Sequence, residues 1–107
     1  MEQKKPRTYH DEFAEQFIAL MYEQWLDILL VASQQSPRVA SLLRVAAPVS
    51  LQRTKGMWRI QVATRSSEIR EKLLQPRDNE ILAQAIRLYY HREAQLKLPR
   101  ISVDFDE

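Results

Sequence analysis

Residues 49–63 read VSLQRTKGMWRIQVA, and apolar and polar side chains alternate in them on both sides of Gly56. Period-two alternation with β-branched and aromatic residues is typical of a half-buried strand. The short segment Thr54-Lys55-Gly56 between the two runs predicts a hairpin turn, with Gly56 at a positive φ. The stretch therefore predicts an antiparallel hairpin with one covered face and one face in water.

A third strand is predicted near the C-terminus, where Ile101, Val103 and Phe105 alternate with polar residues. A sheet with this alternation carries helices on one face only. The expected inward set is Val49, Leu51, Trp58, Ile60, Val62, Ile101, Val103 and Phe105. The expected solvent-facing set is Ser50, Gln52, Arg59, Gln61, Ser102 and Asp104. This second set holds no aromatic side chain on which a base could stack, which counts against RNA recognition by the sheet face.

Helices are predicted on both sides of the hairpin. Residues 11–35 contain no proline or glycine, and Asp11 is a suitable N-cap, so we expect one helix of roughly 37 Å there. Ser36 and Pro37 predict the start of a shorter second helix that ends before Pro48. After the hairpin, Ser66 predicts the start of a third helix, which Pro76 ends, and Asp78 predicts the cap of a fourth.

The predicted element order is therefore α-α-β-β-α-α-β, an α+β fold with a three-stranded sheet. Residues 1–10 are rich in charge and predict a flexible arm, and residues 11–107 predict a single domain. A chain of 107 residues is long enough for one hydrophobic core.

The composition excludes several kinds of site. The absence of cysteine excludes disulfides, thiolate metal sites and a cysteine nucleophile, and Gly56 alone cannot form a glycine-rich phosphate loop. His10 and His91 have no neighbours at metal-ligand spacing, and Ser66 and Ser67 suit helix caps better than nucleophiles. We therefore expect no metal, no cofactor and no enzymatic activity.

The most apolar run covers residues 17–32, and it contains Glu23, Gln24 and Asp27. A membrane span needs about 20 apolar residues with few charges, so no membrane association is predicted. The polar N-terminus does not have the pattern of a signal peptide, and a cytoplasmic location is expected.

The same run predicts a contact surface. Its apolar residues cover about half of the helix circumference, whereas a surface helix needs a stripe of roughly 100°. One interpretation is a central helix enclosed by its own core. The other is a helix that packs on the core and also meets another protein or a second copy of the chain, giving an oligomer. The second interpretation predicts contact through Phe17, Leu20, Tyr22, Leu30 and Val31.

Positive charge is concentrated between Lys55 and Arg100, with ten Lys or Arg residues against five Asp or Glu, although the net charge of the chain is only +2. Such a region can contact phosphates. The residues of this predicted nucleic-acid surface are Lys55, Arg59, Arg65, Arg70 and Lys72. The alternative is an ordinary solvated face, in which Glu68 and Lys72 form an i, i+4 pair.

Residues 22–106 resemble a known family of small domains. The resemblance rests on apolar residues in a fixed order of helices and strands. They are Trp25, Leu26 and Leu29, the segment LLRVAA at 42–47, the strands PVSL at 48–51 and WRIQV at 58–62, a helix from Ser66 with Leu73, then Ile81, Ala85 and the strand ISV at 101–103. The sequence is similar to the domain that follows the ATPase collar in the gamma/tau subunit of bacterial DNA polymerase III. It is also similar to the KH-like N-terminal domain of DnaA-type initiators.

The resemblance implies a KH-like fold and a non-enzymatic docking domain of the bacterial replication machinery. The chain has no ATPase module, so no ATP site is implied, and the helix before Trp25 is longer than the family pattern requires. No binding residue follows from the resemblance. A KH-like module that binds nucleic acid is the alternative, although the Gly-x-x-Gly loop of KH domains cannot be formed with one glycine.

Overall fold

A computed structural model describes residues 11–73 and 75–106 of the chain. The elements in chain order are α1 (Glu12–Glu23), α2 (Trp25–Ser33), α3 (Pro37–Leu43), β1 (Ala47–Thr54), β2 (Met57–Ala63), α4 (Ser67–Lys72), α5 (Pro76–Ala94) and β3 (Arg100–Asp106). This arrangement confirms the predicted α+β class. The arm predicted for residues 1–10 lies outside the described residues.

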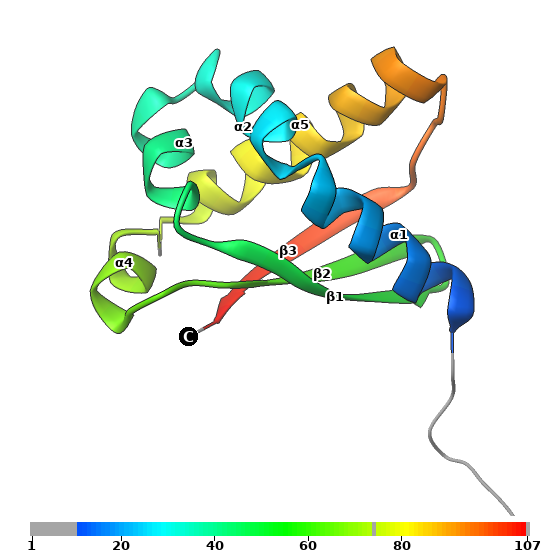
Figure 1. Cartoon of the computed structure of the whole chain (residues 1–107), viewed down its shortest axis with the longest axis horizontal. Helices are drawn as coiled ribbons and strands as arrows, with labels where there is room; N and C mark the ends of the chain where they lie inside the picture. Colours follow the sequence, from blue (N-terminus) through cyan, green and yellow to red (C-terminus); the bar gives the residue numbers. More distant parts are fainter. Residues whose placement is uncertain (1–10, 74, 107) are drawn as a thin grey trace, which may run out of the picture.

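The sheet has three strands in the order β1-β2-β3. Strands β1 and β2 form the predicted antiparallel hairpin, and β3 pairs with β2 in parallel, so the sheet is mixed. Figure 1 shows α1, α2, α3 and α5 stacked over one face of the sheet, while no helix of the described residues covers the opposite face. The prediction of helices on one face is therefore confirmed.

The hydrophobic core lies between the sheet and this helical layer. From the sheet, Ile60 and Val62 are completely buried, and Leu51 is nearly so. From the helices, Ile28 on α2 and Ile86 on α5 are also completely buried. The predicted inward residues Ile101, Val103 and Phe105 of β3 are buried as well. The alternation in the sequence thus places most strand residues on the correct face.

Val49 is the exception, and its predicted inward position is wrong. The register of β1 against β2 shifts between Pro48 and Ser50, which leaves Val49 as the extra residue of a bulge. Its side chain is 52% exposed, while Pro48 before it is buried. Trp58 lies on the helix-facing side as predicted. It is only partly buried there, where its ring meets Phe17 at a centroid distance of 5.2 Å.

The single helix predicted for residues 11–35 is also wrong, because the chain breaks at Gln24 into α1 and α2. Gln24 has φ −99° and ψ 12°, which is outside helical geometry. The two helices cover different elements, since α1 packs on β1 and α2 packs on α5. Tyr90 of α5 donates a hydrogen bond to Gln24 Oε1 at 2.9 Å, which holds the break in place. The helices are roughly 18 and 14 Å long, so no part of a 37 Å helix projects from the fold.

Three predicted helix caps are confirmed and one is wrong. Asp11, Ser36 and Ser66 each accept a hydrogen bond from the backbone N–H three residues later. Asp78 is no cap: α5 begins at Pro76, and its N-cap residue is Gln75. The Asp78 carboxylate is instead 1% exposed and accepts a hydrogen bond from Arg38 of α3 at 2.7 Å. Gly56 has the predicted positive φ, +77°.

Candidate functional site

The residues predicted to meet a partner protein occupy two different environments. Phe17 is 7% exposed and packs on Tyr90 at a ring-centroid distance of 4.9 Å. It belongs to the core and offers no surface to a partner, which corrects that part of the prediction. Val31 is partly buried against the same core. Leu20, Tyr22 and Leu30 are exposed, at 42%, 63% and 66%.

Leu26 and Val45 extend this exposed apolar set, with exposed fractions of 61% and 47%. Neither residue is among those that the sequence pattern predicted to meet a partner. Leu26 and Leu30 are four residues apart, so they share the outer face of α2, opposite the buried Ile28 and Ala32.

A groove of about 400 Å³ lies between α2 and α3. We call it the α2–α3 groove. It is lined by Leu26, Leu29, Leu30, Ser33, Pro37, Ala40, Ser41 and Arg44. Leu29 and Ala40 are buried and form the floor, while Leu26 and Leu30 stand exposed along one side. The groove is therefore apolar in its floor and along one wall.

A second hollow of about 730 Å³ adjoins the groove, and we call it the Tyr22 hollow. It lies between the α1–α2 junction and the ends of β1 and β2, and its lining includes Tyr22, Val45 and Arg65. Leu26 and Arg44 line both depressions, so the apolar surface is continuous from one to the other. Leu20 lines neither of them.

The charges around this surface are unevenly placed. Of the residues that the structure describes, Arg44 alone is charged and lines the α2–α3 groove. It has no ion-pair partner among residues 11–73 and 75–106. The Tyr22 hollow has mixed charge, with Glu23 and Asp27 on α1 and α2 facing Arg65 after β2. A partner that enters the groove therefore meets a guanidinium at its rim.

The five residues of the predicted nucleic-acid surface are not gathered in one place. Lys55 lies in the hairpin turn, and Arg65 follows the opposite end of β2, a strand roughly 23 Å long. Arg59 forms an ion pair with Asp104 at 3.2 Å on the open sheet face. Arg70 donates to the carbonyl of Phe105, and Lys72 ends α4. Only Arg65, Arg70 and Lys72 belong to one segment of the structure, the region of α4.

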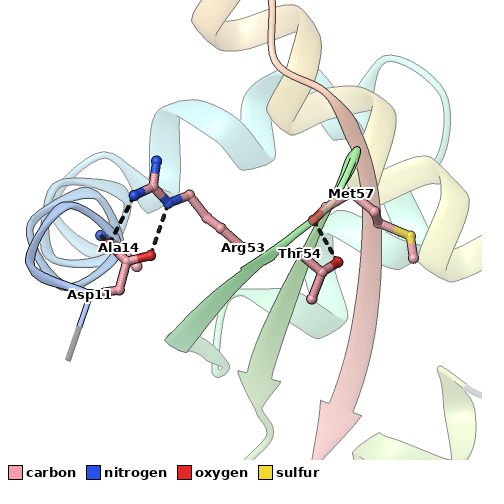
Figure 2. A network of polar contacts seen from close by, with 5 residues as sticks. All are labelled: Asp11, Ala14, Arg53, Thr54 and Met57. Atoms are coloured by element: carbon pink, nitrogen blue, oxygen red, sulfur yellow. Dashed lines mark hydrogen bonds and ion pairs between the residues drawn. The ribbon is translucent and has the colours of Figure 1, made fainter. Parts of the chain in front are cut away.

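A polar network at the start of α1 has a structural role, and Figure 2 shows its members. The Arg53 guanidinium of β1 bonds both oxygens of Asp11, at 2.9 and 3.0 Å. Asp11 also caps α1 through Ala14, and Arg53 lies 4.3 Å from the centroid of the Phe13 ring. The hydrogen bond from Arg53 lowers the pKa of Asp11 below its ordinary value. The network fastens α1 to the edge of the sheet.

The buried tyrosines of α5 also have a structural role. Burial raises the pKa of Tyr90 and of Tyr89, whose rings meet edge to face at 5.0 Å.

Within residues 11–73 and 75–106, no three His, Asp or Glu side chains are grouped so that they could hold a metal ion. None of the helices in this described part is both long and apolar enough to cross a membrane.

The chain was compared with known proteins at the levels of sequence family and of structure. No protein-family model, no curated protein and no solved structure matches it. The resemblance of residues 22–106 to a known family therefore stays an expectation from the sequence.

Proposed function

We propose that this protein is a non-enzymatic interaction module that binds an amphipathic helix of another protein in the α2–α3 groove. One observation carries this proposal. Leu26 and Leu30, one helical turn apart, are 61% and 66% exposed beside an apolar floor. Exposed apolar patches next to a groove are typical of protein interaction sites.

The size of the groove and the spacing of its leucines suit a helical ligand. An amphipathic helix presents apolar side chains at i, i+4 and i+7, which can interdigitate with residues spaced as Leu26 and Leu30 are. Complete burial of a leucine side chain stabilises a complex by about 1.5–3 kcal/mol. A carboxylate on the ligand can pair with Arg44, which orients the helix in the groove.

The groove is held in shape before a ligand arrives. The indole Nε1 of Trp25 donates a hydrogen bond to the Leu43 carbonyl at 3.0 Å, which joins the start of α2 to the end of α3. Trp25 and Leu43 are both buried. A preformed groove loses little conformational entropy on binding, which favours affinity.

The association with bacterial DNA replication rests on the sequence resemblance alone. Among the residues that carry this resemblance, Leu26 and Leu29 line the α2–α3 groove. We therefore propose that the helical partner belongs to the replication machinery. The groove proposal is independent of this assignment, because it depends only on the surface itself.

The proposal can be tested by NMR titration of the full chain with a designed amphipathic helix of 16 residues. The probe carries leucine at i, i+4 and i+7 and one flanking glutamate. We expect amide shift changes concentrated in residues 26–44. Leu30→Glu should weaken binding by about tenfold or more, because it replaces a buried contact with a charge.

Val49→Glu is the matched control, because Val49 is also more than half exposed but lies on β1, outside the groove. The control should bind as the wild type does. Binding that survives both Leu26→Glu and Leu30→Glu would overturn the proposal. Light scattering of the pure chain tests the other occupant: a dimer that Leu30→Glu dissociates would assign the groove to a second copy instead.

A further inference from the structure

A second surface with a different character lies on α5, on the side turned away from the core. A hollow of about 390 Å³ is formed there by α5 and the loop that follows it. We call it the α5 patch. It is lined by Gln84, Arg87, Leu88, His91, Leu96 and Lys97, with Leu98 beneath them. Leu88 and Leu96 are 38% and 42% exposed, while Leu98 is 7% exposed.

The end of α5 positions these residues. Gln95 adopts a left-handed conformation with φ 52°, and the next N–H, from Leu96, bonds back to the Tyr90 carbonyl at 3.1 Å. This cap reverses the chain, so the loop returns alongside the helix. Burial of Leu98 anchors the loop. As a result Leu96 and Lys97 line the same hollow as Leu88 and Arg87.

The α5 patch has one sign of charge. Its charged and titratable lining residues are Arg87, His91 and Lys97, and no acidic residue of the described part of the chain lines it. Neither Arg87 nor Lys97 has an ion-pair partner among residues 11–73 and 75–106. The nearest acid along α5, Glu93, is two positions from His91, and residues at that spacing do not share a helix face.

We infer that the α5 patch binds an acidic peptide segment that carries an apolar anchor residue. Carboxylates of such a segment complement the basic side chains, which steers and orients the encounter. An apolar side chain between those carboxylates can pack on the exposed parts of Leu88 and Leu96 and remove them from water. A nucleic-acid backbone would satisfy the charges but would leave the two leucines uncovered. This surface is separate from the α2–α3 groove, so the inference does not depend on the proposed function.

Fluorescence anisotropy of the full chain with labelled 12-residue peptides tests the inference. The first probe alternates glutamate or aspartate with leucine. The second replaces each leucine with serine, and the third replaces each acid with lysine. A 12-nucleotide single strand of DNA is the fourth. We expect the first probe to bind best, with an affinity that falls as salt rises.

Paired charge reversal identifies the surface. Arg87→Glu with Lys97→Glu should weaken binding of the first probe by roughly tenfold, since two attractions become repulsions. Lys72→Glu is the matched control, because Lys72 is exposed at the end of α4, which Figure 1 shows at the opposite end of the fold from the loop after α5, and it should leave binding unchanged. Leu30→Glu should also leave it unchanged, which separates this surface from the α2–α3 groove.

Three outcomes would overturn the inference. The first is equal binding of the acidic leucine probe by the wild type and the double reversal variant. The second is equal affinity for the leucine and serine probes, which would leave no role for Leu88 and Leu96. The third is DNA binding that exceeds peptide binding and is lost in the double reversal variant, which would reassign the patch to nucleic acid. Circular dichroism of each variant verifies that the fold is intact.

Discussion

Trp25 and Leu43 are joined by a buried hydrogen bond from the indole Nε1 to the main-chain carbonyl, at 3.0 Å. The two residues are 18 positions apart in the chain, at the first residue of α2 and the last residue of α3. The Leu43 carbonyl, at the end of α3, also accepts from the Ala46 N–H at 3.1 Å, so the indole supplies its second hydrogen bond. This bond therefore stabilises the relative placement of the two helices that enclose the α2–α3 groove.

Replacement of Trp25 tests this relationship. Trp25→Phe keeps an aromatic ring but removes the indole donor, so the Leu43 carbonyl keeps only its bond from the Ala46 N–H. We expect a loss of about 1 kcal/mol in the free energy of unfolding, measured by urea denaturation. Tyr22→Phe is the control, because Tyr22 is 63% exposed. If Trp25→Phe were as stable as the wild type, the hydrogen bond between Trp25 and Leu43 would make no contribution to the stability of the fold.

The pair of Arg38 and Asp78 supports a second prediction. Asp78 is 1% exposed, accepts from Arg38 at 2.7 Å, and has its other oxygen, Oδ2, without a hydrogen-bond partner among residues 11–73 and 75–106. Arg38→Ala leaves this carboxylate buried without its counter-charge. Breaking a buried pair costs about 3–5 kcal/mol, and because the Arg38 side chain is 49% exposed we expect about 2 kcal/mol.

Arg59→Ala is the matched control for Arg38→Ala. Arg59 also pairs with an aspartate, Asp104, but both side chains are about half exposed on the open sheet face. Its loss should cost less than about 1 kcal/mol. Equal urea midpoints for the two variants would show that burial of Asp78 does not govern the stability of this pair.

Backbone conformation gives two opposite expectations. Gly56 has φ +77° with no neighbouring atom in the way of a side chain, so Gly56→Ala costs only conformational energy, about 1 kcal/mol. Gln95 has φ 52° although it is not glycine, so Gln95→Gly should relieve strain at this position and stabilise by up to about 1 kcal/mol. Thermal unfolding measures both. A lower melting temperature for Gln95→Gly would contradict the second expectation.

The ion pair of Asp11 and Arg53 predicts a dependence of stability on pH. The hydrogen bond from Arg53 lowers the pKa of Asp11 below 3.8, its ordinary value. The unfolded chain therefore binds the proton more readily, so this contribution is present above pH 3.8 and is lost as pH falls through the lowered folded pKa. Urea unfolding of wild type and Asp11→Asn should differ at pH 7 and converge in acid. If the difference in the free energy of unfolding between the two proteins were the same at every pH, the ion pair of Asp11 and Arg53 would not contribute to the pH dependence of stability.

The nucleic-acid alternative has a test of its own. Arg65 precedes α4 and Lys72 is its last residue. Their joint replacement by glutamine removes two charges from the one region that holds three of the predicted basic residues. If this region contacts phosphates, single-stranded DNA binding at low salt should weaken and the salt dependence should become shallower. DNA binding with an unchanged salt slope would exclude this region from the contact.

The hairpin, the third strand and three helix caps could be predicted from the sequence, because each depends on residues close together in the chain. Alternation over residues 57–63 places Ile60 and Val62 in the core as the structure has them. Val49 could not be placed correctly, because the bulge is a property of the pairing between β1 and β2. Of the residues predicted to meet a partner, Leu20, Tyr22 and Leu30 are exposed and Phe17 is buried, while the exposed Leu26 was not among them.

The sequence by itself determined local periodicity, caps and turns, which set the fold class. The break at Gln24 is stabilised by Tyr90, 66 residues further along the chain, and it lets α1 pack on β1 while α2 packs on α5. Both candidate surfaces form between elements that meet only in the folded chain: α2 and α3 enclose one groove, and α5 and the loop after it enclose the other hollow. Only the tertiary structure could decide which apolar side chains stay in water, because exposure depends on what packs against a helix rather than on the helix itself.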